Sequence, residues 1–295
     1  MTTWLEIDSF ALIHNIRKAR EAIGEGISIF AVVKANAYGH GLAIAAEAFW
    51  RGGVDGFLGT ETRDALELVT AKYRVPILFL QPPEIKDASE LIRHNVRLAG
   101  VSLQSLELFE QAGQRAGMKP IIHLEVETGM HRLGVAMSDV MDIITQAKDG
   151  KRPIIVEGLF THLYAPEDRK ASEMQIGLVA NFLFELQQKN IPSPFVHVLA
   201  SRGALVYPQA LYDAVRLGHA IYGLDSDYTL AEPAMTWKST TCLHVPDMRL
   251  HMKVRKRSQL ISGWSISSPH TGARFRSHRY ISLSLMTSFE TDFCC

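Results

Sequence analysis

Short apolar runs rich in β-branched residues recur along the chain up to about residue 223. Eight of them fit buried strands, namely 27–35, 55–60, 75–81, 96–102, 120–127, 154–162, 195–201 and 214–223. The segments between them carry apolar residues every three or four positions, as amphipathic helices do. The clearest of these helical segments are 41–52, 61–73, 102–117 and 172–190. Strands and helices are therefore expected to alternate.

This alternation predicts an α/β fold. Eight buried strands separated by helices favour a (β/α)8 TIM-type barrel, and an open doubly wound sheet is the weaker alternative. The active sites of such barrels lie at the C-terminal ends of the strands. Polar residues at these ends, or in the loops just after them, are therefore the candidates for chemistry: Lys34, Arg132, His162, Ser201 and Arg216.

The pattern changes after about residue 247. Basic residues and serines crowd together there, and neither the period of a strand nor that of a helix is sustained. One interpretation is a basic arm for nucleic acid or anionic lipid. The favoured interpretation is a disordered or aberrant extension that follows a barrel domain over 1–235.

Composition narrows the classes of partner. The chain has 295 residues, and its 31 Lys and Arg balance its 31 Asp and Glu, so no overall charge attracts nucleic acid or an anionic membrane. The cysteines, Cys242, Cys294 and Cys295, are too few and too poorly spaced for a disulfide framework or a zinc site. No signal-type segment or membrane span is visible. We expect a cytoplasmic protein with a small-molecule partner, without metal, nucleic acid or membrane.

The segment VVKANAYGHG (32–41) places Lys34 at the end of an apolar strand. A lysine that loses solvation there has a lowered pKa, and its neutral amine can form a Schiff base. A lysine that simply reaches from a strand end into solvent is the commoner explanation for a single residue of this kind. Lys34 alone therefore leaves both explanations open.

The context of Lys34 resembles the cofactor-attachment motif of alanine racemases. The similarity starts at TWLEIDSFALIHNI (3–16) and continues in the family's order through 127–135, 158–168, 197–205, 215–224 and 233–239. It implies an isomerase that uses pyridoxal 5'-phosphate to interconvert L-alanine and D-alanine, which is destined for cell-wall precursors. It also implies a homodimer, although part of the family's dimer interface belongs to a domain that we do not find here.

The resemblance implies a catalytic set. Lys34 would carry the internal aldimine with pyridoxal phosphate and act as one of two bases at the substrate α-carbon. Arg132 would support the phenolic oxygen of the cofactor and the substrate carboxylate, and His162 would pack on the cofactor ring. Arg216 would face the pyridine nitrogen, and its permanent charge would keep that nitrogen unprotonated. Many family members carry a carbamylated lysine seven residues before Arg132. Glu125 stands there, so we predict an ion pair between Glu125 and Arg132.

The resemblance also implies the surroundings of the cofactor. Tyr38 would contact the phosphate, and Ser201, Gly218 and Tyr222 fall where the family's phosphate cup lies. His219 belongs to the same group, although the family usually has an aliphatic residue at that position. A serine at a strand end can equally satisfy local backbone, so the resemblance decides its assignment.

Two features depart from the family. Ala200 replaces an asparagine that usually precedes the phosphate-binding serine. The family also continues into a β domain with a tyrosine that serves as the opposite-face base, whereas 236–295 resembles only a remnant of it and Tyr280 lies in an unrelated context. Loss of that base should cost activity. The alternatives are a pyridoxal-phosphate-binding barrel without racemase turnover and, less favoured, a related barrel decarboxylase.

Overall fold

The computed structural model describes residues 2–224, 231–240 and 280–283. Contacts divide the chain into two units. One unit is Ser9–Glu232, and the other combines the segment up to Asp8 with the residues from Pro233 onward.

The first unit contains a ring of eight parallel strands. In sheet order they are β2 (Ser28–Val32), β3 (Gly56–Gly59), β4 (Ile77–Phe79), β5 (Arg97–Gly100), β6 (Ile121–Glu127), β8 (Ile155–Phe160), β9 (Phe195–His197) and β10 (Ala214–Leu217), and β10 pairs with β2. The ring closes after β9, where Ala200 bridges to Arg216 and the Arg216 N–H donates to the Leu199 carbonyl at 3.0 Å. The (β/α)8 barrel expected from the sequence is confirmed.

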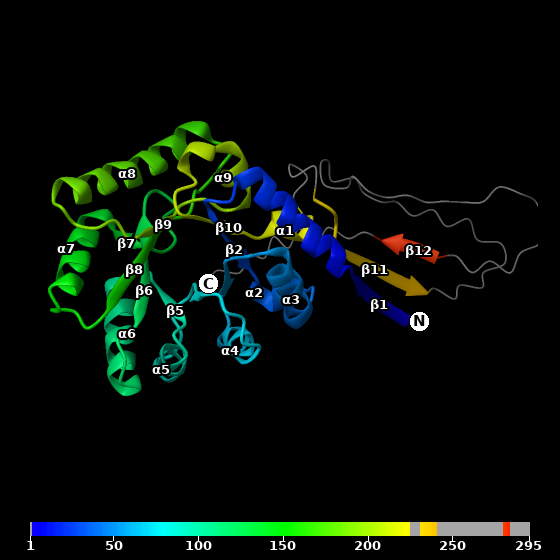
Figure 1. Ribbon diagram of the computed structural model, residues 1–295, viewed down its shortest axis with the longest axis horizontal. Helices are drawn as coiled ribbons and strands as arrows, with labels where there is room; N and C mark the ends of the chain where they lie inside the picture. The colour runs from blue at the N-terminus through cyan, green and yellow to red at the C-terminus, as the bar shows by residue number, and fades with distance from the viewer. Residues whose placement is uncertain (1, 225–230, 241–279, 284–295) are drawn as a thin grey trace, which may run out of the picture. The chain divides into compact units, whose positions relative to one another are not determined.

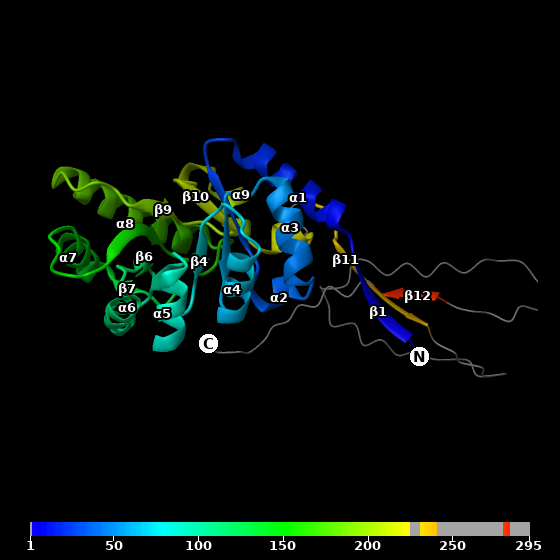
Figure 2. The ribbon, with the colours of Figure 1, turned by 60° about the horizontal axis from the view of Figure 1, so that its bottom comes forward.

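Helices cover the outside of this ring (Figure 1). They are α1 (Ser9–Ile23), α3 (Leu42–Gly52), α4 (Thr62–Thr70), α5 (Ile85–Arg93), α6 (Leu103–Ala116), α7 (Met137–Lys148), α8 (Arg169–Gln188) and the short α9 (Ser201–Val206). The turned view shows α4, α5 and α6 following one another along the sheet (Figure 2). The four helical segments predicted from their periodicity form α3, α4, α6 and α8.

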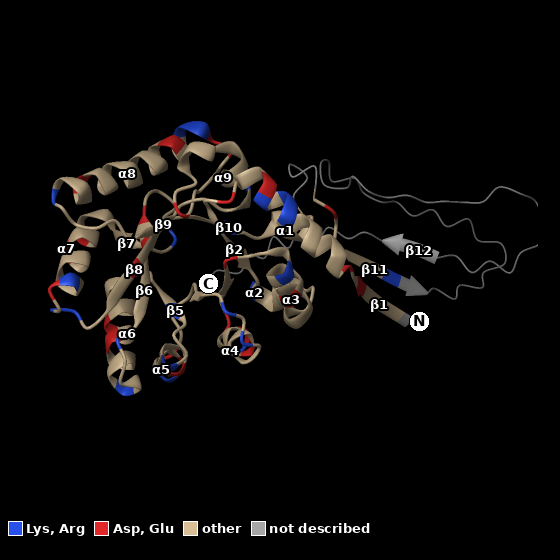
Figure 3. Ribbon diagram, viewed as in Figure 1, with Lys and Arg blue, Asp and Glu red and all other residues tan. Residues whose placement is uncertain are grey.

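Apart from the buried Asp64 on α4, the charged residues of these helices are partly or fully exposed. Residues of both signs occur along α1, α4, α5, α6 and α8, where the ribbon of Figure 3 is blue for Lys and Arg and red for Asp and Glu. An amphipathic helix places its apolar face on the sheet and its charged face in water. In α6, accordingly, Leu106 and Phe109 are fully buried.

The barrel interior is filled by side chains from strands that are not neighbours. Phe30 on β2 stacks on Phe195 of β9, with ring centroids 5.9 Å apart, and lies 6.0 Å from the His197 ring. The contacts between β2 and β9 skip β10 and are possible only across the interior, so Phe30, Phe195 and His197 face inward. Phe160 on β8, the strand next to β9, stacks on the same His197 ring at 4.9 Å. The interior is therefore packed rather than open.

Two of the strands that end earlier than the apolar pattern predicted lead directly into turns. The runs 27–35 and 214–223 form strands only over Ser28–Val32 and Ala214–Leu217. After β2 the chain enters the short helical turn α2 (Lys34–Tyr38), and after β10 it forms the 3-10 turn η2 (His219–Tyr222). Both turns leave the same edge of the sheet, because β2 and β10 are parallel neighbours.

The second unit is a small antiparallel sheet. Its strand β1 (Thr2–Ile7) pairs with β11 (Met235–Thr240), which pairs with β12 (Tyr280–Leu283). The expectation of a disordered or aberrant tail concerns residues that, apart from β12, lie outside the described ranges. Within those ranges no helix has the length and apolar character that a membrane crossing needs.

Candidate active site

Lys34 opens the turn that follows β2. The next four residues, 35–38, all have left-handed backbone, with φ between 52° and 55°. Residues other than glycine adopt this conformation only when their surroundings impose it, and such strain is common at functional sites. The Asn36 side chain contributes by accepting a hydrogen bond from the Leu42 N–H at 2.8 Å. The turn thereby presents Lys34 and Tyr38 from one short segment.

The Lys34 amine lies 5.8 Å from the centre of the Tyr38 ring. The residue is exposed at the end of the barrel. Its pKa is nevertheless lowered, first because the surrounding protein removes solvation from the charged amine and second because Arg132 is also positive. A larger fraction of this amine is therefore neutral than in an ordinary surface lysine.

Tyr38 meets the start of η2. A Cβ added to Gly218 would lie 2.7 Å from the Tyr38 hydroxyl, so only a glycine allows this approach. The Gly218 N–H donates to the Ser201 hydroxyl at 3.0 Å, and the Ala220 N–H points to the same oxygen at 3.5 Å. Hydroxyl and backbone N–H groups from α2, α9 and η2 thus gather at one place.

Tyr222 packs against this cluster from the protein interior. Its side chain is fully buried, and its hydroxyl donates to the Val32 carbonyl at 3.0 Å. The Tyr38 ring lies 5.0 Å from the Tyr222 ring and 5.4 Å from the ring of His219, which is exposed. Burial raises the pKa of Tyr38 to about 12 and that of Tyr222 well above its ordinary value. Both phenols therefore stay neutral hydrogen-bond donors.

Asn15 on α1 supports η2 from the outer layer. Its amide donates to the Ile221 carbonyl at 3.1 Å and to the Glu232 carbonyl at 2.8 Å, and its oxygen accepts from the Glu232 N–H at 2.7 Å. A buried amide with these partners holds two distant backbone segments together. Sequence reasoning missed this residue, because nothing in its helix distinguishes it from an ordinary polar position.

Arg216 is the buried cation of the site. Its guanidinium donates to the Thr161 carbonyl at 2.6 Å, the Val198 carbonyl at 3.1 Å and the carbonyl of His197. Burial lowers the pKa of Arg216 to about 10, which leaves it protonated at neutral pH. Its position is therefore fixed by several acceptors from β9 and the loop after β8.

His162 follows β8 beside Arg216. Its Nδ1 lies 3.5 Å from an Arg216 nitrogen. Desolvation, together with the positive charges of Arg216, Arg132 and Lys34, lowers the pKa of His162 to about 3. The imidazole is therefore neutral at neutral pH and adds no charge beside Arg216.

The ion pair predicted between Glu125 and Arg132 is not formed. Glu125 is buried on β6, whereas Arg132 is exposed in the loop after that strand, and within the described residues no hydrogen bond or ion pair joins them. The loop is held instead by Glu127, which accepts from the Gly129 N–H and, at 2.7 Å, from the His131 N–H. Burial raises the pKa of Glu125, and Arg216 opposes this shift more than Arg132 does.

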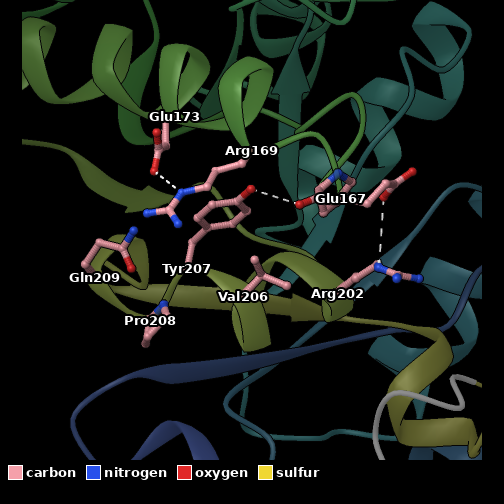
Figure 4. A pocket seen from close by; sticks show the side chains of 9 residues that line it. Glu167, Arg169, Glu173, Arg202, Val206, Tyr207, Pro208 and Gln209 are labelled. Carbon is pink, nitrogen blue, oxygen red and sulfur yellow. Dashed lines mark hydrogen bonds and ion pairs between the residues drawn. The ribbon is translucent and has the colours of Figure 1, made fainter.

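A separate pocket of about 520 Å³ lies between the start of α8 and the end of α9 (Figure 4). Arg169 faces Glu173 there at 2.7 Å, and Arg202 faces Glu167 at 3.9 Å. The pocket contains none of the residues that the sequence singled out. Because its cations already face carboxylates, it offers no unbalanced charge to a ligand, and the barrel end remains the candidate site.

The family described as "Alanine racemase, N-terminal domain" matches residues 7–226. The chain belongs to the alanine racemase family. Alanine racemase from Methanococcus maripaludis is 28% identical over 260 residues, covering 85% of this chain and 69% of the relative. Alanine racemase from Methylacidiphilum infernorum is 35% identical over 243 residues, covering 80% of this chain and 60% of the relative.

A solved alanine racemase shares the fold. The crystal structure of alanine racemase from E. faecalis superposes with a TM-score of 0.73 at 30% identity, covering 82% of this chain and 67% of that chain. The region matched by the alanine racemase family, 7–226, contains every residue of the candidate site from Lys34 to Tyr222. The expected family is thereby confirmed.

The barrel of this alanine racemase family member also holds polar residues that sequence reasoning missed. His123 on β6 and His197 on β9 are buried, and Glu157 on β8 lies beside His123. A signal for them existed: each is a polar residue inside a run that is mostly apolar. Its meaning depended on which residues face the barrel interior, and that follows only from the register of the closed sheet.

Proposed function

We propose that this chain is an alanine racemase that interconverts L-alanine and D-alanine, with pyridoxal 5'-phosphate held by Lys34. One observation carries the proposal. Lys34, whose amine has a lowered pKa, is the first residue of the turn that brings Tyr38 against Gly218, and the Gly218 N–H donates to the Ser201 hydroxyl. A nucleophilic amine beside a cluster of neutral donors suits a ligand with both a carbonyl and a phosphate group.

The residues fit this cofactor. Because Gly218 lacks a Cβ, the Tyr38 hydroxyl comes close to it, so this hydroxyl gathers with the Ser201 hydroxyl and the N–H groups of the turn, as anion sites built from backbone require. Arg216 supplies a fixed donor-only cation at the barrel end. When bound, pyridoxal phosphate supplies an electron-withdrawing ring and a carbonyl that condenses with amines.

Each residue then has a distinct task. The Lys34 amine takes and returns a proton at the substrate α-carbon, and its lowered pKa provides the neutral form that accepts the proton. Arg216 retains its own proton, so it can donate a hydrogen bond to a ring nitrogen without transferring the proton. His162, which is neutral beside Arg216, would pack on the cofactor ring without adding a charge. Arg132 would attract the substrate carboxylate from its exposed loop.

Racemisation also needs a proton on the opposite face of the α-carbon. Lys34 serves one face only, so a second group must deliver or remove the other proton. Exchange of the α-proton with solvent needs one base, whereas inversion needs both. Measuring the two processes separately therefore tells whether the protein supplies the second group.

The family resemblance supports the remaining parts of the proposal. These are a cytoplasmic homodimer and the supply of D-alanine to cell-wall precursors. A dimer is tested by the mass of the protein in solution, with and without pyridoxal phosphate.

The deciding experiment is a titration of the purified full chain with pyridoxal phosphate, followed by incubation with L-alanine in deuterated water. We expect visible absorbance of bound cofactor, α-deuteration and formation of D-alanine. Lys34→Ala should abolish the absorbance, and Lys189→Ala, which alters an exposed lysine paired with Glu185 on α8, should leave it unchanged.

Absorbance and deuteration without D-alanine would favour the alternative of a cofactor-binding barrel without racemase turnover. Carbon dioxide release from a basic amino acid would favour a decarboxylase. Equal absorbance in the Lys34→Ala and parent proteins would remove Lys34 from its assigned role.

A further inference from the structure

Polar side chains form a continuous chain through the barrel interior, from β5 to β10. Arg97 contacts both carboxylate oxygens of Glu157, at 2.9 and 3.0 Å. Glu157 accepts from His123 Nε2 at 3.0 Å, and His123 Nδ1 lies 2.8 Å from His197 Nε2. His197 Nδ1 lies 2.9 Å from the Arg216 guanidinium. Arg216, the buried cation of the candidate site, thus ends a chain that begins at the opposite end of the barrel.

The direction of every hydrogen bond in this chain follows from its last member. A guanidinium only donates, so His197 Nδ1 accepts and its proton must be on Nε2. That proton points at His123 Nδ1, which must therefore accept, so the His123 proton is on Nε2. It is donated to Glu157, which as a carboxylate only accepts. One arrangement of protons satisfies all the contacts.

Protonation of either imidazole would break this arrangement. A proton on His197 Nδ1 would face the Arg216 N–H, and a proton on His123 Nδ1 would face the proton on His197. Burial lowers the pKa of both histidines, in agreement with two neutral rings. The pKa of Glu157, lowered to about 2 chiefly by its hydrogen bond with His123, keeps the outer end ionised.

The surrounding residues are shaped to hold this chain. Phe160 stacks on the His197 ring with an interplanar angle of 7° and also lies under the Arg216 guanidinium at 5.3 Å. A Cβ on Gly158 would come 2.3 Å from His123 Nδ1, so the ring occupies space that only glycine leaves free. Buried polar groups are costly unless they are satisfied, and here each has a partner.

We propose that His123 and Glu157 are positioning residues: with Arg97 they form a directed hydrogen-bond relay that fixes the His197 tautomer and thereby holds the Arg216 guanidinium in place at the active site. The relay itself is a property of the barrel. Its consequence for the reaction rests on the proposed function, in which Arg216 donates to the cofactor ring. Neither His123 nor Glu157 touches the reacting atoms.

A polar core that only stabilises the barrel would not pass a change in one hydrogen bond on to the next residue. The relay predicts that it does, because the direction of each hydrogen bond fixes the direction of the next. Weakening the acceptor at Glu157 should change the hydrogen bond of His123 and, through it, that of His197. A core that only fills space would confine the change to the ring beside the mutation.

The test uses nitrogen-15 and proton NMR of the histidine rings in the cofactor-free full chain. In the parent protein we expect both His123 and His197 as neutral rings with the proton on Nε2, assigned by the loss of one signal in His123→Leu. Either ring protonated at neutral pH, or with its proton on Nδ1, would overturn the relay. This measurement needs no variant at Glu157 and no cofactor.

Propagation is tested with Glu157→Gln, which keeps the size of the side chain and removes its charge. The Nε2 proton signals of His123 and His197 should both move upfield, the second by less. The control is Glu110→Gln. Glu110 also pairs with a partly buried arginine, Arg152, at 2.6 Å, but it does not belong to the hydrogen-bond relay. A shift at His123 alone, or equal shifts in the control, would contradict the proposal.

The effect on the reaction is measured in the cofactor-loaded protein. Glu157→Gln should lower kcat by about tenfold, the lower end of what outer residues that orient a functional group contribute, and change KM for alanine by less than about twofold. If NMR shows the relay in the parent protein and Glu157→Gln nevertheless leaves kcat unchanged, the proposed effect of the relay on the reaction is wrong. Absence of any turnover in the parent protein would instead count against the proposed function alone.

Discussion

The Tyr38 hydroxyl lies so close to Gly218 that a Cβ on the glycine would stand 2.7 Å from the phenol oxygen. The contact ties the turn after β2 to the turn after β10. It therefore connects Lys34 with the cluster of N–H groups around Ser201.

Gly218→Ala should weaken the binding of pyridoxal phosphate by about tenfold, because loss of a positioned donor such as Tyr38 is worth about 1 to 2 kcal/mol. An absorbance titration of the purified protein measures this. Gly177→Ala on α8 is the matched control, since a Cβ there meets nothing within 4 Å. Equal affinity in the Gly218→Ala and Gly177→Ala proteins would show that Tyr38 moves aside without consequence.

Tyr222→Phe should destabilise the barrel by about 1 to 2 kcal/mol, because the Val32 carbonyl loses a buried donor. Denaturant unfolding followed by circular dichroism measures the change. Tyr73→Phe is the control: its hydroxyl contacts Glu47 at a longer 3.3 Å in a more accessible position, and we expect less than about 0.5 kcal/mol. A larger loss at Tyr73 than at Tyr222 would contradict the assignment.

Asn15→Ala should remove about 3 kcal/mol of stability and also weaken cofactor binding, because the backbone of Ile221 and Glu232 is left without its partners. The exposed Asn181 on α8 provides the comparison, and Asn181→Ala should change stability by less than about 0.5 kcal/mol. Unfolding curves and cofactor titrations on both variants decide the matter. Loss of stability with unchanged cofactor affinity would mean that η2 keeps its shape without Asn15.

The sequence predicted the barrel because buried parallel strands and amphipathic helices each leave a periodic pattern. It could not predict the left-handed turn over 35–38, since those φ values are imposed by contacts such as that of Asn36 with Leu42. Nor could it show that His123 and His197 meet inside the barrel, because strand register decides which residues face inward. The family resemblance, with Glu125 at the position of a carbamylated lysine, suggested an ion pair with Arg132, but Arg132 is exposed in the loop after β6 whereas Glu125 is buried.

Glu125→Gln should lower turnover and at the same time raise the free energy of unfolding at neutral pH. The folded protein raises the pKa of Glu125 above its ordinary 4.5, chiefly by burial, so it binds a proton there more readily than the unfolded chain does. Stability linked to Glu125 is therefore fully present below pH 4.5 and is lost as the pH rises through the raised pKa. A neutral glutamine avoids this loss.

Unfolding curves of the parent and of Glu125→Gln, collected across that pH range, should diverge in favour of the variant as the pH rises. The variant also removes a negative charge that faces Arg216 and Arg132, so racemisation should fall while stability increases. An ion pair between Glu125 and Arg132 in solution would lower the pKa of Glu125 and reverse the sign of the divergence. The sign of the difference in unfolding free energy between the two proteins thus tells whether Glu125 is a buried carboxylate without an ion pair or one paired with Arg132.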